Sequence, residues 1–116
     1  NIFSREGKDI HCQIPIDMAR AALGGSIEVP TIEGGKLKIN YESGTQSGKR
    51  FRLRGKGMPG LRGTSRGDAY VEAIVETPVN LTSKQKELLK EFVRSGGTKG
   101  PQTDSFTEKL KRFWKQ

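Results

Sequence analysis

The stretch SIEVPTIEGGKLKINY, residues 26–41, decides the fold because it predicts a β-hairpin. Apolar and polar residues alternate on both sides of residues 33–35, as is typical of strands with one buried face. The two glycines of that central segment supply the positive φ angles that a tight turn needs. The expected cross-strand neighbours are Ile27 and Val29 on the first strand and Leu37 and Ile39 on the second.

The same period of two recurs on either side of the hairpin. In residues 10–16 it directs Cys12 into a core and leaves His11 on the opposite face. Residues 50–54 and 68–76 alternate in the same way and predict further strands. The segment MARAALGG, residues 18–25, breaks the alternation and predicts a short helical turn that ends at its glycines. The fold class is therefore mainly β, a small two-sheet, sandwich-like domain with a short helix.

The pattern changes after Pro78, where helical spacing replaces alternation. Thr82 and Gln85 have the spacing of a capping box, in which each side chain satisfies a free backbone N–H. Apolar residues follow at helical intervals up to Gly96-Gly97. We therefore divide the chain into a β-domain over residues 1–80 and a helical segment over residues 81–116.

The helical segment contains a predicted linker and a second predicted helix. Residues 96–104, GGTKGPQTD, have the composition of a linker. The helix is expected over residues 105–116, beginning at a second capping box formed by Ser105 and Glu108.

An apolar stripe on this last helix is the strongest functional signal that the residues alone provide. Its members lie at i, i+4, i+7 and i+8, and they are Phe106, Leu110, Phe113 and Trp114. An isolated helix this short is marginal in water, so the stripe indicates docking onto another surface. We predict that these four residues mediate dimerisation. Docking onto the same chain stays open, and the basic opposite face leaves a membrane-surface helix as a lesser alternative.

The net charge of +8 is concentrated in residues 48–66, which hold seven Lys and Arg and no acidic residue. Such a segment can neutralise phosphates, so a basic nucleic-acid-binding domain is the alternative function, although not the one we favour. Residues 55–60 match the pattern G-x-G-x-x-G, but a predicted strand follows them. A nucleotide site needs a helix at that point, because the helix N-terminus holds the phosphates.

Composition excludes several other classes of protein. The chain has one His and one Cys, which excludes an internal disulfide and a cysteine-based zinc cluster within this stretch. Strand parity places these two residues on opposite faces, so they are poorly arranged as nucleophile and base. We therefore expect no enzyme activity and no metal or cofactor here. No apolar run is long enough to cross a membrane.

Three segments together resemble the C-terminal part of the DnaJ family of J-domain co-chaperones, in its zinc-containing class. They are DIHCQIPIDMARAALGGSIEVPTIEGGKLKI (9–39), GTQSGKRFRLRGKGMPGLRG (44–63) and GDAYVEAIVETPVNLTSKQKELLKEF (67–92). The likeness covers about residues 3–93 and becomes loose after Gly96. It implies the family's second C-terminal β-domain followed by its dimerisation segment.

The resemblance also implies partners and a location. We expect a homodimer that helps present unfolded client polypeptides to a DnaK-type chaperone, with client-contacting residues that the sequence does not identify. The chain begins with Asn1 and lacks the family's His-Pro-Asp and Cys-x-x-Cys motifs, so we expect a fragment of a longer protein. The J domain that contacts the DnaK-type partner and the zinc sites would lie in the upstream part. The bacterial cytoplasm is the expected compartment, with the mitochondrial matrix as the alternative.

Overall fold

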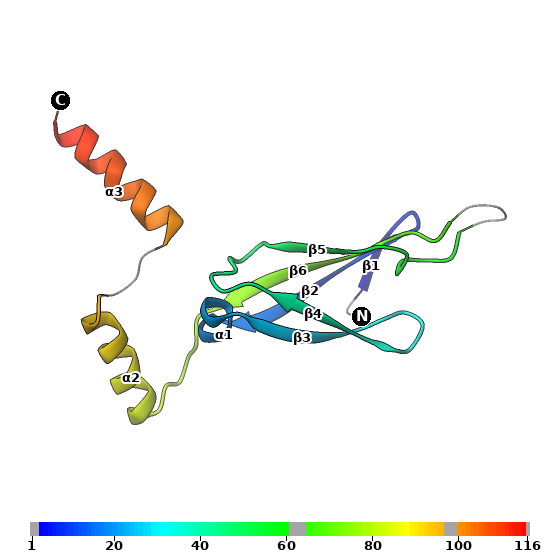
Figure 1. The fold of residues 1–116 in the computed structure, drawn as a ribbon, viewed down its shortest axis with the longest axis horizontal. Helices are drawn as coiled ribbons and strands as arrows, with labels where there is room; N and C mark the ends of the chain where they lie inside the picture. The colour runs from blue at the N-terminus through cyan, green and yellow to red at the C-terminus, as the bar shows by residue number, and fades with distance from the viewer. Residues whose placement is uncertain (1–2, 61–64, 97–99, 116) are drawn as a thin grey trace. The chain divides into compact units, whose positions relative to one another are not determined.

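The computed structural model describes residues 3–60, 65–96 and 100–115. Contacts divide the chain into two compact units, Asn1–Pro78 and Val79–Gln116. The first unit is built mainly from strands and the second from helices (Figure 1).

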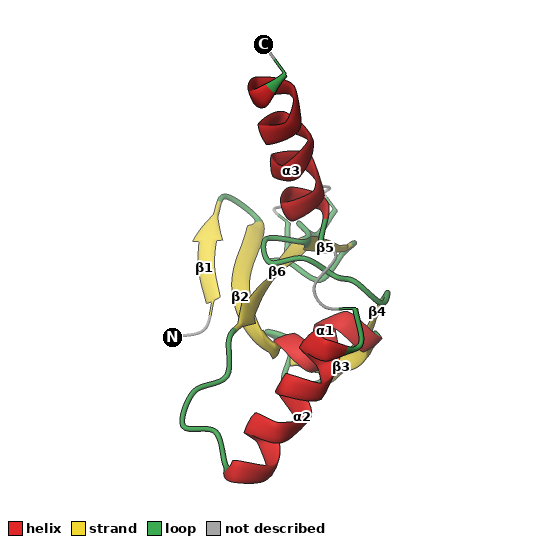
Figure 2. Cartoon of the chain, turned by 90° about the vertical axis from the view of Figure 1, so that its left-hand side faces the viewer, coloured by secondary structure: helices red, strands yellow, loops and turns green. Residues whose placement is uncertain are grey.

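The first unit consists of two sheets and one short helix. Its elements, in chain order, are β1 (Phe3–Glu6), β2 (Asp9–Asp17), α1 (Met18–Leu23), β3 (Gly25–Pro30), β4 (Lys36–Tyr41), β5 (Arg50–Leu53) and β6 (Ala69–Glu76). One sheet has the strand order β1-β2-β6-β5, and β3 and β4 form the other (Figure 2). Figure 1 shows α1 at one end of this unit and the β3–β4 connection at the other. The predicted fold class, mainly β with two sheets and a short helix, is confirmed.

The predicted hairpin is formed by β3 and β4. Their antiparallel register places Ile27 opposite Ile39 and Val29 opposite Leu37, as the alternation predicted. The turn closes through a hydrogen bond of 2.9 Å from the Thr31 amide to the Gly35 carbonyl. Gly34 has a φ of 96°, in the region that glycine adopts without steric cost.

The centre of the larger sheet is a parallel pairing of β2 with β6. The register runs from Ile10 opposite Ala69 to Asp17 opposite Glu76. Nothing in the local alternation predicts this pairing, because it joins segments far apart in the sequence.

The core lies between the inward faces of the two sheets. One cluster of buried residues joins Cys12 and Val71 of the larger sheet to Val29 and Ile39 of the hairpin. A second cluster lies towards α1 and contains Ile16, Ala21, Tyr41 and Ala73. Cys12 is buried as predicted, and this burial raises the pKa of its thiol because the thiolate would lose its hydration.

The described residues Gly57, Met58 and Gly67, which lie between β5 and β6, pack against the backbone of Lys8. The Met58 amide donates to the Lys8 carbonyl at 2.7 Å, and the Gly67 amide donates to the Met58 carbonyl at 2.9 Å. A Cβ on Gly57 would lie 2.6 Å from the Lys8 carbonyl oxygen, and a Cβ on Gly67 would overlap the same carbonyl. These glycines are therefore required for close backbone packing. The next element that the structure describes after them is β6 and not the helix of a nucleotide site.

The second unit contains α2 (Ser83–Arg94) and α3 (Pro101–Trp114). The predicted capping box begins α2: the Gln85 amide donates to Thr82 Oγ1 at 3.1 Å, and the Thr82 amide donates to Gln85 Oε1 at 2.8 Å. No helix within residues 3–60, 65–96 and 100–115 combines the length and apolarity needed to cross a membrane.

The predicted start of the last helix is wrong. α3 begins at Pro101 with Gly100 at its N-cap and no side-chain cap, instead of at the Ser105–Glu108 box. Proline is well tolerated in a first turn, because its fixed φ suits a helix and the N–H that it lacks would have no partner there. Of the linker predicted over 96–104, residues 101–104 are therefore helical, and residues 97–99 lie outside the described part of the chain.

Candidate interaction surfaces

The predicted dimerisation residues all lie on α3, and its apolar side chains are largely open to solvent. Phe106, Phe113 and Trp114 are 61%, 69% and 72% exposed, and Leu110 is half-buried. No residue of this helix is buried. Exposed aromatic side chains at helical spacing are typical of a docking face. We call Phe106, Leu110, Phe113 and Trp114 the α3 stripe.

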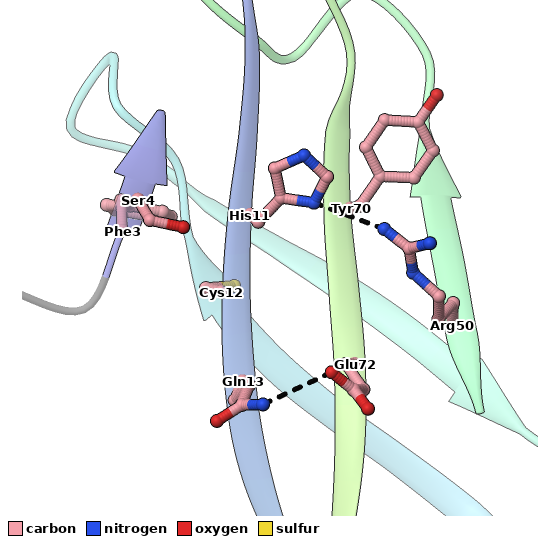
Figure 3. Close-up of a pocket in the computed structure, with 8 residues that line it drawn as sticks. All are labelled: Phe3, Ser4, His11, Cys12, Gln13, Arg50, Tyr70 and Glu72. Atoms are coloured by element: carbon pink, nitrogen blue, oxygen red, sulfur yellow. Dashed lines mark hydrogen bonds between the residues drawn. The ribbon is translucent and has the colours of Figure 1, made fainter. Parts of the chain in front are cut away.

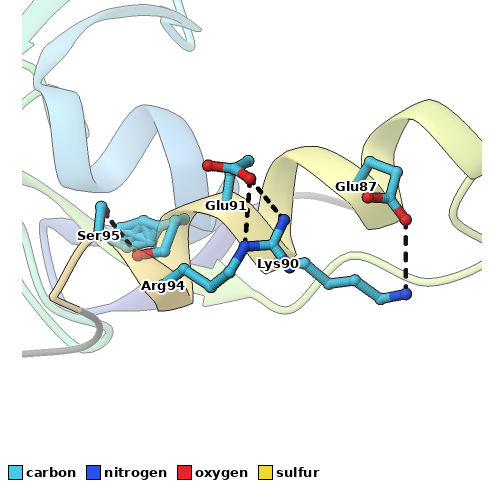
Figure 4. Close-up of polar contacts among 6 residues, drawn as sticks. Glu87, Lys90, Glu91, Arg94 and Ser95 are labelled. Carbon is cyan, nitrogen blue, oxygen red and sulfur yellow. Dashed lines mark hydrogen bonds and ion pairs between the residues drawn. The ribbon is translucent and has the colours of Figure 1, made fainter.

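A similar apolar face lies on α2. Phe92 and Val93 are 49% and 63% exposed, and no residue of the helix is buried. The polar residues of α2 form pairs one turn apart, Glu87 with Lys90 and Glu91 with Arg94 (Figure 4). Such exposed pairs contribute little to stability. Both helices of the second unit therefore expose apolar side chains to solvent.

The first unit has a groove between the edge strands β4 and β5. Among the described residues, β4 pairs only with β3 and β5 pairs only with β6. The groove has a volume of about 790 Å³. Its apolar residues are Ile39 and Tyr41, which are buried, and Phe51 and Leu53, which are half-buried. Its charged residues are Lys38, Glu42, Lys49, Arg50 and Arg52. We call it the β4–β5 groove.

Only one of the groove cations is neutralised by a carboxylate among the residues that the structure describes. Asp68 accepts hydrogen bonds from Arg52 Nε at 2.8 Å and from the Gly55 amide at 2.9 Å. The Gly55 hydrogen bond, followed by the one from Arg52, lowers the pKa of Asp68. Within the same described part, Lys38, Lys49 and Arg50 have no such partner, so the groove keeps a positive surplus.

We expect Asp68→Asn to destabilise the first unit at neutral pH, because the amide provides no charge for Arg52. The contribution of the carboxylate is complete above the ordinary Asp pKa of about 3.9 and is lost as the pH falls through the lowered pKa of the folded state. In urea unfolding, the stability difference between wild type and variant should stay constant from about pH 7 to pH 5 and shrink below about pH 4. If the stability difference between wild type and Asp68→Asn stayed the same below about pH 4, the ionised Asp68 carboxylate would not be its source.

The solvent-facing side of the larger sheet carries a hollow of about 420 Å³. The rings of His11 and Tyr70 are stacked there, with centroids 5.1 Å apart (Figure 3). Arg50 Nη2 lies 3.2 Å from His11 Nδ1, and its guanidinium lies over the Tyr70 ring at 5.2 Å. His11 therefore faces away from the core as predicted, but it is partly buried and contacts three residues, since its Nε2 also lies 3.4 Å from Glu6.

Acidic residues at and just before β6 lie across the sheet from the arginines of β5. Asp68, just before β6, pairs with Arg52. Glu72 instead accepts a hydrogen bond of 3.2 Å from Gln13 (Figure 3). The described residues contain no group of three or more His, Cys, Asp or Glu side chains that could hold a metal ion.

The β4–β5 groove is the feature that sequence reasoning missed. Its strands were predicted individually, but a groove exists only because the two sheets remain unpaired at this position. One signal in the sequence could have indicated a binding surface here. Basic residues are in excess around Phe51 and Leu53, and the formation of a strand does not require them.

Comparison with known proteins gives consistent matches over both units. The family model described as DnaJ C terminal domain matches residues 1–78, and the one described as Chaperone protein DnaJ C-terminal region matches residues 84–116. The "Chaperone protein DnaJ" of Roseobacter denitrificans is 56% identical over 113 residues, covering 97% of this chain and 29% of that protein. Those of Dinoroseobacter shibae and Rhodopseudomonas palustris are 54% and 55% identical, each covering 97% of this chain and 30% of the relative.

Proposed function

This chain belongs to the DnaJ C-terminal domain family, and from that membership we propose that it is the part of a co-chaperone that joins two copies and contacts unfolded clients. It spans about 30% of the length of the curated relatives that it matches. Activity, clients and partners are therefore proposed for the longer protein, with this chain supplying its dimer contact and one of its client surfaces.

The observation that carries the proposal is the exposed α3 stripe. Burying its four apolar side chains contributes roughly 6 to 12 kcal/mol gross per chain, at about 1.5 to 3 kcal/mol each. A symmetric dimer counts this contribution twice, which offsets an association cost of about 4 to 15 kcal/mol. The basic residues between the stripe positions, among them Lys109 and Lys111, can stay solvated while the apolar face is covered.

We expect the 116-residue chain to sediment as a dimer over a concentration series and a chain ending at Gly100 to sediment as a monomer. The shortened chain retains the whole of the first unit and α2, so its loss of association would be assigned to α3. A wild type that is monomeric at every accessible concentration would overturn the proposal. A shortened chain that still dimerises would also do so, by placing the contact elsewhere.

The client surface that the first unit supports best is the β4–β5 groove. Its apolar residues offer contacts to hydrophobic side chains, and its two edge strands offer backbone groups to an extended polypeptide. Two grooves on one dimer raise the effective concentration of the second contact once the first has formed. Binding of extended peptides to this groove tests the assignment.

Presentation of clients to a DnaK-type chaperone belongs to the same proposal. It requires a J domain, which we place in the longer protein. The three relatives named above are bacterial proteins, which favours the bacterial cytoplasm over the mitochondrial matrix as the compartment.

A further inference from the structure

We propose that the β4–β5 groove selects extended segments in which acidic residues alternate with apolar ones, bound as an added strand on the free edge of β5. The inference rests on the proposed client contact and specifies the class of segment that the groove takes. It follows from the position of β5 in the sheet, the alternation of its side chains and the charge of the groove.

The backbone of β5 is available for pairing on its outer side. β5 is the last strand of the order β1-β2-β6-β5, and within the part of the chain that the structure describes it pairs with β6 alone. The groove runs along this edge, so a segment lying in it would meet the unpaired backbone groups of residues 50–53. Addition of a strand to such an edge gives affinity through main-chain hydrogen bonds and specificity through alternate side chains.

The side chains of β5 alternate between two different environments. Phe51 and Leu53 are half-buried and pack against the core cluster that contains Val29 and Ile39. Arg50 and Arg52 lie on the other face. Because neighbours on adjacent strands lie on the same face, the residues of an added strand would alternate between apolar and cationic neighbours. A segment matches both environments when its own residues alternate between apolar and acidic.

The remaining charges of the groove favour the same partner. Arg50 Nη2 lies 3.2 Å from His11 Nδ1. Among the described residues, Lys38, Lys49 and Arg50 pair with no carboxylate, and Glu42 is the one acidic residue that lines the groove. An acidic strand would supply the missing partners. A second copy of β5 would instead place arginine beside arginine, which is the kind of like-charge contact that keeps edge strands from pairing with each other.

The test uses fluorescein-labelled ten-residue peptides titrated with the 116-residue chain and followed by anisotropy. The first peptide alternates Glu with Val and Phe. The second has Gln in place of each Glu, and the third groups the same residues as the first into an acidic block and an apolar block. The fourth is the first peptide with alternate backbone nitrogens methylated, which removes the donors that a strand needs.

At low salt we expect the first peptide to bind about tenfold more tightly than each of the other three, since several cross-strand charge pairs each contribute a few-fold. Its advantage over the Gln peptide should narrow at high salt, because the lysines are exposed and their attraction is screened. Lys38→Glu combined with Lys49→Glu should abolish that advantage while the Gln peptide still binds. The matched control, Lys84→Glu with Lys86→Glu, makes the same charge change on α2 and should leave the advantage unchanged.

Each of the following results would contradict one part of the proposal. Equal affinity for the Glu and Gln peptides overturns the acidic preference and leaves the client contact standing. Equal affinity for the methylated peptide overturns strand addition. Failure of every peptide to bind overturns the groove as a client surface as well. Displacement of the first peptide by a DNA oligonucleotide, with an affinity that falls steeply with salt, replaces the peptide by nucleic acid as the ligand.

Discussion

Replacing Phe113 and Trp114 of the α3 stripe by alanine should convert the proposed dimer into a monomer. These are two large and well-exposed side chains of α3. Truncating a central aromatic residue of an interface costs about 2 kcal/mol or more, and a symmetric dimer carries both truncations in each chain, so association should weaken by roughly 8 kcal/mol, or about a millionfold. Sedimentation velocity over a concentration series measures the shift. Alanine is a good helix former, so the helix itself should persist in circular dichroism.

The matched control changes two residues of the same helix outside the stripe. Lys109→Ala with Lys111→Ala makes the same number of truncations, and we expect the dimer to persist. An unchanged oligomer in the Phe113→Ala, Trp114→Ala variant would show that the stripe does not form the contact. Equal weakening by the lysine control would show that the loss arises from the helix in general and not from its apolar face.

Substituting Gly67 by alanine should strongly destabilise the first unit. The added Cβ would overlap the Lys8 carbonyl, which is backbone and is held by the Met58 amide, so neither side can easily move. Overpacking of this kind costs about 3 kcal/mol. For a unit of this size each kcal/mol lowers Tm by about 4 to 8 °C, so we expect a fall of roughly 12 to 24 °C. Thermal unfolding followed by circular dichroism measures it.

Gly35→Ala is the control for the chemistry of the substitution. A Cβ at that position would meet Thr31 Oγ1 at 3.5 Å, which is an ordinary contact. We expect its Tm to stay within a few degrees of wild type. If Gly67→Ala and Gly35→Ala had the same Tm, the close packing of Gly67 on Lys8 would not contribute to the stability of the unit.

Local patterns predicted the elements whose partners lie nearby in the sequence. The β3–β4 hairpin follows from alternation around Gly34, and the start of α2 follows from the spacing of Thr82 and Gln85, because in both cases the interacting groups are only a few residues apart. The start of α3 was missed because Pro101 and its neighbours have the composition of a linker. In the structure that proline occupies a first turn.

The features that could not be predicted depend on contacts between distant segments. Gln13 and Glu72 are hydrogen-bonded across 59 positions of sequence, and no short-range pattern indicates that their strands are parallel. The β4–β5 groove exists because β4 of one sheet and β5 of the other are not paired with each other. The role of the α3 stripe as a dimer contact stays a prediction, since it depends on a second chain.

The parallel pairing of β2 with β6 also sets the order in which the first unit can form. The β3–β4 hairpin joins neighbours in the sequence and can close early, whereas β2 has to wait until β6 has been synthesised. During translation the edge of β2 that pairs with β6 therefore has no partner until Glu76 has left the ribosome. The apolar side chains of β2, among them Ile10 and Ile16, lack their β6 neighbours during this time. During that interval the first unit is incompletely folded, and its unpaired strand is open to aggregation.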